Sequence, residues 1–324
     1  MRILVTGGTG FVGRHLLREL RGRNRDVLLF ARSSSDITEA RELGCEVFVG
    51  DLTDFAGVRE AVAAADAVIH VGEIGLSLPD ATARNVSLVR EMLAAARSSG
   101  LRRFVLVSSV TTVAPPSACP ADEDTEPLAN HLVDDAYTRY KRGCEQAVFE
   151  AGQPATIIRG STIYGPGAHY LVWFVRWARR MGRLGLPFPG RIDVRLPTVH
   201  VADVAQILAT AVDLEGDDVT VYNAADDCGT TPADFVRRLA ELCDMPMRLR
   251  QTPLVLQRAA AAVLDAMQTW RAEPPLAGGV YDFLTHDAVF SNRRLKTDLN
   301  LRLRYPSIQE GLPETVAWLR DHIT

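Results

Sequence analysis

Tyr137 and Lys141 are the residues whose types and spacing most clearly suggest chemistry, and they lie four apart in the stretch YTRYK. That spacing places both side chains on one face of a helix. A tyrosine hydroxyl, with a pKa of roughly 10, exchanges protons poorly at neutral pH unless a nearby cation stabilises the phenolate. Ser109, at the end of an apolar run, and Thr111 offer hydroxyls that could bind a reacting oxygen. Together these residues predict acid–base chemistry at an oxygen atom, although Tyr-xxx-Lys alone would favour an ordinary amphipathic helix.

A glycine-rich stretch, TGGTGFVG, lies between a short apolar run and a helical pattern. Three of its glycines are spaced three apart, which allows a tight turn and close approach of a pyrophosphate to the N-terminus of the helix. In this context the stretch predicts a dinucleotide site rather than a turn without a ligand. The predicted contacts are Gly7, Gly10, Phe11, Val12 and Gly13.

The ends of the next two apolar runs carry further candidate cofactor contacts. Arg32 and Ser33 end the second run, and no acidic residue follows before Asp36. A basic residue at this place suits the 2′-phosphate of NADP, so we expect NADP(H) to be favoured over NAD(H). Asp51 and Leu52 follow the third run, where the carboxylate could bind an adenine amino group. The alternative for Asp51 is a cap for the helix that follows.

The elements that must position these residues alternate along the first half of the chain. Near-continuous apolar runs separated by helical patterns predict an α/β fold with a doubly wound parallel sheet. We expect strands at 3–6, 26–31, 46–49, 67–71, 103–107, 155–159 and 219–223, and a first helix over 11–20. Further helices are expected at 57–65, 85–98, 137–150, 171–180, 203–213, 232–243, 255–270 and 307–322. Proline and glycine clusters after about residue 166 predict a smaller, mostly helical C-terminal lobe.

Composition excludes several classes of protein. The 324 residues are 47% hydrophobic and 23% charged, which is typical of a soluble globular chain of about two domains. A net charge of −4 leaves no polybasic field for nucleic acid or anionic lipid. The five scattered cysteines form no CxxC pair, so we expect free thiols and no metal. With no signal or membrane segment in view, we expect a cytoplasmic protein.

The whole pattern resembles the extended short-chain dehydrogenases/reductases, in their epimerase/dehydratase-like branch. The resemblance covers nearly the entire chain, and besides the stretches above it rests on GDLTD at 50–54, VIHVGE at 68–73, Asn85-Val86, LVSSVTTV at 106–113, IIRGSTIYGPG at 157–167, VHVADVA at 199–205 and VYNAADD at 221–227. It implies a Rossmann-type dinucleotide-binding domain formed by 1–165 and about 198–225. Residues 166–197 and 226–324 would then form the substrate-binding lobe.

The resemblance also implies roles for individual residues. Tyr137 would be the acid/base, and Lys141 would hold the nicotinamide ribose and tune Tyr137. Ser109 would contact the reacting oxygen, with Thr111 as its helper or substitute. Further cofactor contacts are expected at Val71, Gly72 and Ile163, and substrate contacts at Tyr164, His169 and Arg195.

Departures from the family pattern concern mainly the substrate. Members that act on nucleotide sugars often carry Arg-Asp where this chain has Leu196-Pro197, and a second family arginine is replaced within 284–287. Arg195 lies one residue before the position of the family arginine. We take this as an argument against a sugar nucleotide. Glu73 and Gly160 also depart from the pattern, and Glu73 would bring a carboxylate near the cofactor.

The sequence therefore predicts an enzyme: an NADP(H)-dependent oxidoreductase that moves a hydride between nicotinamide and a carbonyl or secondary alcohol of a small, apolar molecule. Two alternatives stay open: a nucleotide-sugar epimerase or dehydratase with tightly bound NAD(P), and a non-catalytic nucleotide-sensing protein. A homodimer also stays open. Candidate apolar walls of the pocket are Tyr164, Tyr170, Trp173, Phe174, Leu186, Phe188 and Val194.

Overall fold

The computed structural model describes residues 1–75, 80–128, 135–181, 184–188, 190–247, 249–251, 253, 256 and 284–323. The expected helix at 255–270 lies, but for residue 256, outside these residues. Among the described helices, none is both long enough and apolar enough to span a bilayer.

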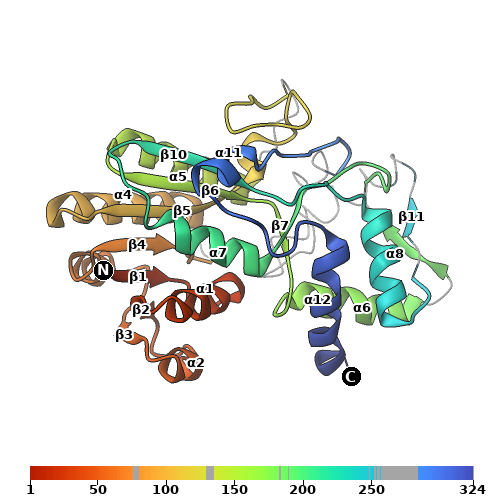
Figure 1. The fold of residues 1–324 in the computed structure, drawn as a ribbon, viewed down its shortest axis with the longest axis horizontal. Helices are drawn as coiled ribbons and strands as arrows, with labels where there is room; N and C mark the ends of the chain where they lie inside the picture. Colours follow the sequence, from red (N-terminus) through yellow and green to blue (C-terminus); the bar gives the residue numbers. More distant parts are fainter. Residues whose placement is uncertain are drawn as a thin grey trace.

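A seven-stranded parallel sheet forms the larger part of the molecule, in the order β10-β6-β5-β4-β1-β2-β3 (Figure 1). Its strands are β1 (Arg2–Thr6), β2 (Asp26–Ala31), β3 (Glu46–Val49), β4 (Ala67–His70), β5 (Arg103–Ser109), β6 (Ala155–Gly160) and β10 (Val219–Ala224). The order reverses beside β1, where Thr6 is in register with both Phe30 and His70. Ligands of doubly wound sheets bind at the carboxyl ends of the strands at such a switch point.

Helices cover both faces of this sheet because its strands are apolar on both sides. One core lies under α1 (Phe11–Gly22), α2 (Thr38–Glu42), α7 (Val201–Ala211) and α11 (Arg293–Asp298). The opposite core lies under α3 (Phe55–Ala63), α4 (Ala81–Ser99) and α5 (Ala136–Ala151). The predicted doubly wound sheet is thereby confirmed.

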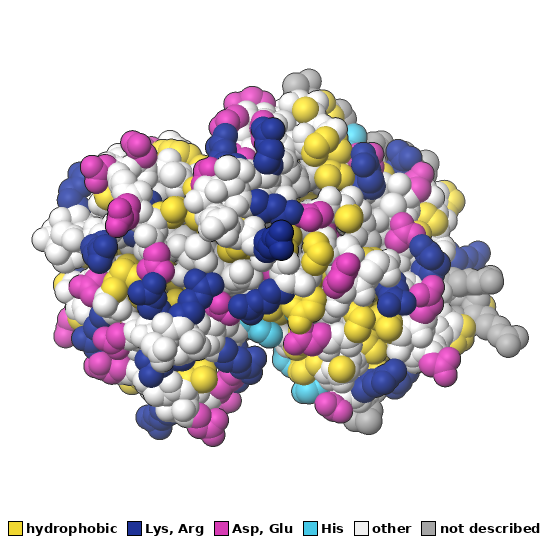
Figure 2. All heavy atoms as spheres, viewed as in Figure 1, with side chains coloured by type: hydrophobic (Ala, Val, Ile, Leu, Met, Phe, Trp, Pro, Cys, Tyr) yellow, Lys and Arg dark blue, Asp and Glu magenta, His cyan; other side chains and the backbone are white. Residues whose placement is uncertain are grey.

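Among the described helices, α6 (His169–Met181), α8 (Pro232–Cys243) and α12 (Ile308–His322) form a smaller lobe with its own core, at the right of Figure 1. In this lobe β8 (Leu186–Phe188) pairs with β11 (Leu249–Gln251). A second short pair, β7 (Thr162–Tyr164) with β9 (Thr198–His200), joins the two parts. Figure 2 shows a notch between the sheet part and the lobe, with histidine side chains on its wall.

The structure differs from the sequence expectation in its short elements. The three-residue strands β7, β8, β9 and β11, the five-residue helix α2 and the six-residue helix α11 were not predicted, since such lengths show too little periodicity. β5 runs two residues further than expected because Ser108 and Ser109 pair with Arg159 and Gly160 of β6. Leu295, in α11, packs in the core of the sheet although the sequence suggested the lobe for this segment.

Candidate active site

The glycine-rich loop after β1 leaves no room for side chains. Gly7 has a φ of +71°, and a Cβ there would lie 2.5 Å from the backbone nitrogen of Gly72. A Cβ on Gly13 would collide with the carbonyl oxygen of Gly7. Gly10 is the N-cap of α1 and offers no side-chain cap, so the N–H groups of the first turn stay available to an anion. This cradle fits the pyrophosphate of a dinucleotide.

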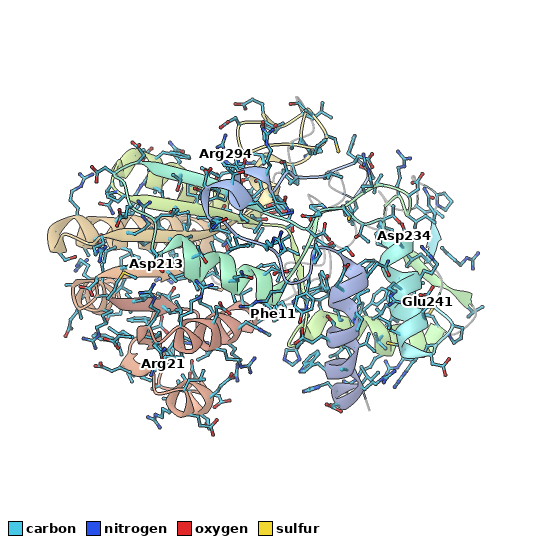
Figure 3. The ribbon with its side chains drawn as sticks, in the orientation of Figure 1. Phe11, Arg21, Asp213, Asp234, Glu241 and Arg294 are labelled. Carbon is cyan, nitrogen blue, oxygen red and sulfur yellow. The ribbon has the colours of Figure 1, made fainter. Side chains whose placement is uncertain are left out.

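The glycine-rich loop lies where the sheet part meets the lobe. Gly72, after β4, lies against Gly7, and Leu52 Cδ1, after β3, lies 3.2 Å from where a Gly72 Cβ would be. Phe11 packs against the core of the lobe, and Figure 3 shows it at the N-terminal end of α1, facing that lobe. Val12, Val71 and Ile163 pack instead against the core of the sheet.

The residues expected at the adenosine end are exposed at the ends of β2 and β3. Arg32 and Ser33 are exposed, and no carboxylate in the described part of the chain pairs with Arg32. Asp51 accepts hydrogen bonds from the Thr53 backbone N–H (2.8 Å) and hydroxyl (2.7 Å). These bonds, with a smaller contribution from Arg32, hold the pKa of the Asp51 carboxyl below its usual value. Asp51 thus supports a turn, while Asp54 caps α3; adenine contact by Asp51 stays a prediction.

The predicted catalytic residues lie where β5 meets α5. Asp135 caps α5 by accepting from the Thr138 N–H (2.6 Å), which starts the helix just before Tyr137. Lys141 is buried, and its Nζ donates to the carbonyl of Val107 in β5 (2.8 Å). The same Nζ lies 5.6 Å from the centroid of the Tyr137 ring. Lys141 therefore ties the helix that carries Tyr137 to the strand that ends in Ser109.

The two hydroxyls after β5 support each other. Ser109 Oγ accepts from the backbone N–H of Thr111 (3.2 Å) and lies 3.0 Å from its hydroxyl. This bond caps the 3-10 helix η1 (Val110–Val113), which α5 packs against. Ser109 is 6% exposed, at the carboxyl edge of the sheet. Both hydroxyls are in the place that the sequence predicted, and their contact with a reacting oxygen stays a prediction.

A buried ion pair, which the sequence analysis missed, anchors this junction. Arg159 in β6 donates to both carboxylate oxygens of Glu145 in α5, from Nε to Oε1 (3.1 Å) and from Nη2 to Oε2 (2.8 Å). The hydroxyls of Ser108 and Thr112 donate hydrogen bonds to the same carboxylate. The sequence did indicate that Glu145 faces the same side of the helix, because Glu145 follows Lys141 at the same four-residue spacing that separates Lys141 from Tyr137.

His70, at the end of β4, is held neutral. Its Nδ1 lies 2.7 Å from the hydroxyl of Thr6, which also accepts from the Gly72 N–H. Burial, together with the nearby positive charge of Lys141, lowers the pKa of His70 from 6.5 to about 3. The neutral ring therefore adds no charge to the site, in agreement with the structural role that its position within a strand suggests.

The residues expected to touch substrate are engaged elsewhere. Tyr164 is fully buried and donates to the Ser307 carbonyl (3.2 Å), while the His169 ring packs against Trp318 of α12. The Arg195 N–H donates to Asp287 (2.8 Å), whose other oxygen lies 3.5 Å from its guanidinium. These contacts do not join the three residues to Ser109, Tyr137 or Lys141, and their contact with a substrate stays a prediction.

Of the candidate apolar walls, Tyr170 and Trp173 are the most exposed, at 48% and 54%. The Tyr170 hydroxyl donates to the carbonyl of Ile163 (3.1 Å), so its ring lies beside a predicted cofactor contact. The Trp173 ring stacks on that of Trp177. Leu186 and Val194, by contrast, are buried.

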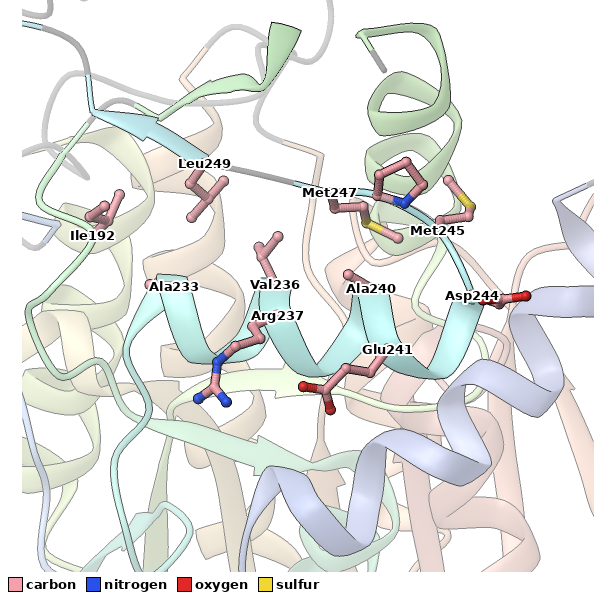
Figure 4. Close-up of a pocket in the computed structure, with 11 residues that line it drawn as sticks. Ile192, Ala233, Val236, Arg237, Ala240, Glu241, Asp244, Met245, Met247 and Leu249 are labelled. Atoms are coloured by element: carbon pink, nitrogen blue, oxygen red, sulfur yellow. The ribbon is translucent and has the colours of Figure 1, made fainter. Parts of the chain in front are cut away.

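A groove of about 570 Å³ runs along α8 in the lobe. Figure 4 shows Val236 and Ala240 pointing from the helix toward Met247 and Leu249. None of the predicted cofactor, catalytic or substrate residues lines this groove, so we assign it no part in the chemistry. In the part of the chain that is described, no three His, Cys, Asp or Glu side chains gather as a metal site would require.

Comparisons with known proteins agree with the fold described above. Residues 3–225 match the family described as "NAD dependent epimerase/dehydratase family". A 4-hydroxy-2-methyl-3-oxo-4-farnesyl-3,4-dihydroquinoline-1-oxide ketoreductase from Stigmatella aurantiaca is 28% identical, over 86% of this chain and 83% of that protein. A 2-alkyl-3-oxoalkanoate reductase from Stenotrophomonas maltophilia (strain K279a) is 36% identical, over 64% of this chain and 65% of that protein. A solved UDP-glucose 4-epimerase of Thermus thermophilus, in complex with NAD, shares the fold with a TM-score of 0.73 at 22% identity over 99% of each chain.

Proposed function

This chain belongs to the NAD-dependent epimerase/dehydratase family, and we propose that it is an NADP(H)-dependent reductase or dehydrogenase of an apolar ketone or secondary alcohol. The observation that carries the proposal is Lys141, which is fixed between the Val107 carbonyl and the ring of Tyr137. A cation held there supports proton exchange by the Tyr137 hydroxyl.

In the proposed reaction, the bound nicotinamide supplies or accepts the hydride. In the direction of reduction, Tyr137 donates its proton to the substrate oxygen, and in the direction of oxidation it accepts that proton. Ser109, supported by Thr111, donates a hydrogen bond to the same oxygen and stabilises the charge that develops on it. Lys141 holds the ribose and stabilises the phenolate that proton donation leaves behind.

The cofactor would lie along the carboxyl edge of the sheet. Gly7, Gly10 and Gly13, with the start of α1 at Phe11 and Val12, would hold the pyrophosphate. Leu52, Val71, Gly72 and Ile163 would border the dinucleotide. Arg32 and Ser33 would bind the 2′-phosphate, and the exposed position of the Arg32 guanidinium supports the preference for NADP(H).

The proposed apolar substrate rests on two observations. Arg195, the cation closest to the place of the family's diphosphate-binding arginine, is engaged by Asp287. The names of the ketoreductase and of the oxoalkanoate reductase above each describe a 3-oxo compound that bears a farnesyl or an alkyl group. Half-exposed Tyr170 and Trp173 would contact such a group.

Calorimetric titration of the NADP-loaded protein tests this proposal, with UDP, dTDP and GDP sugars in one series and apolar 3-oxo compounds in the other. We expect binding only in the second series. Micromolar binding of a sugar nucleotide that is lost in Arg195→Ala would instead support an epimerase or dehydratase, the second candidate, which the family itself favours.

We also propose that 1–165, with about 198–225, hold the dinucleotide, and that 166–197 and 226–324 supply the substrate lobe. The separate cores of the two parts support this division. Because α11 packs on β10 and in the core of the sheet, its residues belong to the sheet part although they lie within 226–324. The five scattered cysteines favour a reducing compartment, and we propose the cytoplasm.

A further inference from the structure

Tyr140 is a second tyrosine beside the catalytic set. It lies three residues after Tyr137 on α5, and the two rings meet edge to face with centroids 5.4 Å apart. Tyr140 is 2% exposed, whereas Tyr137 is more open to solvent. The ring of Tyr140 therefore forms a buried wall against which the ring of Tyr137 rests.

Lys141 connects the two rings. Its Nζ lies 5.0 Å from the centroid of Tyr140 and 5.6 Å from that of Tyr137, within the range of a cation–π contact for both. The Val107 carbonyl holds the same ammonium from the strand side. A displacement of the Tyr140 ring would thus change the surroundings of both catalytic side chains.

Glu73 fixes Tyr140 from the end of β4. The Tyr140 hydroxyl donates a hydrogen bond to the Glu73 carboxylate. The backbone around Glu73 is itself held, because the Thr6 hydroxyl accepts from the Gly72 N–H and Asn85 bonds both the N–H and the carbonyl of Ile74. Burial, followed by the Glu73 charge, raises the pKa of Tyr140, so this hydroxyl stays a donor at working pH.

We propose that Glu73 and Tyr140 are a positioning pair, which holds the ring of Tyr137 against Lys141. The proposal rests on the proposed function, in which Tyr137 exchanges the proton. It accounts for a carboxylate at a place where the family pattern has a small residue.

The carboxylate of Glu73 can be changed while an acceptor stays in place. The Tyr140 hydroxyl donates to it, so Glu73→Gln keeps an acceptor there but loses the charge that strengthens the bond. The other titratable or charged groups of this neighbourhood are Cys144 and Glu145 on α5, His70 on β4 and Arg90 on α4. They are unchanged by a substitution at position 73.

The direct test compares the rate of hydride transfer with NADPH affinity in the full chain. Glu73→Gln keeps an acceptor and removes the charge; we expect hydride transfer to slow about tenfold, with NADPH affinity within twofold. Glu150→Gln, near the exposed end of α5, is the matched control and should leave both quantities unchanged. A wild-type rate of hydride transfer in Glu73→Gln would overturn the proposal.

Turnover provides the second readout, using the ketone selected by titration. Tyr140→Phe keeps the ring and removes only the hydroxyl. We expect it and Glu73→Gln each to lower kcat about tenfold with cofactor affinity within twofold, and the double variant to be no worse than either single variant. If Tyr137→Phe is inactive but both single variants keep the wild-type kcat, the proposed positioning role of the pair is refuted. If Tyr137→Phe itself stays active, the proposed function fails instead.

Discussion

Arg159 and Glu145 form a buried ion pair, with 2.8 Å between Nη2 and Oε2, that joins β6 to the helix carrying Tyr137 and Lys141. Side chains that pair charges inside a protein give little net stability as a pair but cost much when one partner is removed. The pair therefore acts mainly to specify how α5 sits on the sheet.

Arg159→Met should destabilise the protein by roughly 3–5 kcal/mol, because the Glu145 carboxylate would stay buried without its cation. Urea unfolding measures this change in the free energy of unfolding. Glu150 and Arg90 form an exposed pair between α5 and α4, so Arg90→Met is the matched control, with an expected cost of at most about 1 kcal/mol. Equal costs for the two variants would show that burial of the first pair has no energetic role.

Gly13→Ala should lower dinucleotide affinity at least about tenfold, since the new methyl group would collide with the Gly7 carbonyl and displace the loop. Gly22, at the end of the same helix, has open space around its Cβ position. Gly22→Ala should therefore bind NADPH as the wild type does. Fluorescence titration with NADPH compares the two, and normal affinity in Gly13→Ala would contradict the proposed cradle.

Much of this site could be predicted from sequence because the family motifs follow the ends of long apolar strands. The glycine loop, Ser109, Tyr137 and Lys141 are ordered by local patterns of spacing. Partners across the fold were not predictable in the same way. That Glu73 reaches Tyr140 depends on how the segment after β4 packs against α5, and no local period encodes that contact.

The same limit explains why the contacts of the predicted substrate residues could not be foreseen from sequence. Tyr164 follows the strand motif at the expected place, yet its ring turns into the lobe, where it meets His200 and Phe235. The pairing of Arg195 with Asp287 joins two segments 92 residues apart. Side-chain direction at a short strand and long-range pairing are both set by packing of the lobe rather than by sequence spacing.

Arg32 should determine the choice of cofactor. We expect the wild-type protein to bind NADPH more tightly than NADH, and Arg32→Asp to lose tenfold or more of its NADPH affinity, about 1.4 kcal/mol. Arg32→Lys keeps the charge and should keep most of the preference. Tighter binding of NADH than of NADPH by the wild type would show that Arg32 does not meet a 2′-phosphate.

His70 should make stability depend on pH. Its folded-state pKa of about 3 lies below the ordinary 6.5, so the unfolded chain binds a proton more readily between these values. The stability that the neutral His70 ring contributes is fully present above pH 6.5 and is lost as pH falls from there toward 3. At pH 5 the loss should be roughly 2 kcal/mol.

Urea unfolding at pH 7.5 and pH 5 measures this loss as a difference between proteins. Wild type should lose roughly 2 kcal/mol more than His70→Asn over this interval, because only the wild type must keep the buried ring neutral. His322→Asn, at an exposed position, should follow the wild type. Equal losses in wild type and His70→Asn would refute the assigned state of His70.

The most direct measurement of the central claim is single-turnover reduction of the ketone by Tyr137→Phe loaded with NADPH. The account predicts that hydride transfer slows by roughly a hundred- to ten-thousand-fold, because the ring remains but its proton donor is gone. NADPH affinity should stay within about twofold, since Lys141 and the glycine loop are intact. Hydride transfer at the wild-type rate in this variant would contradict the account.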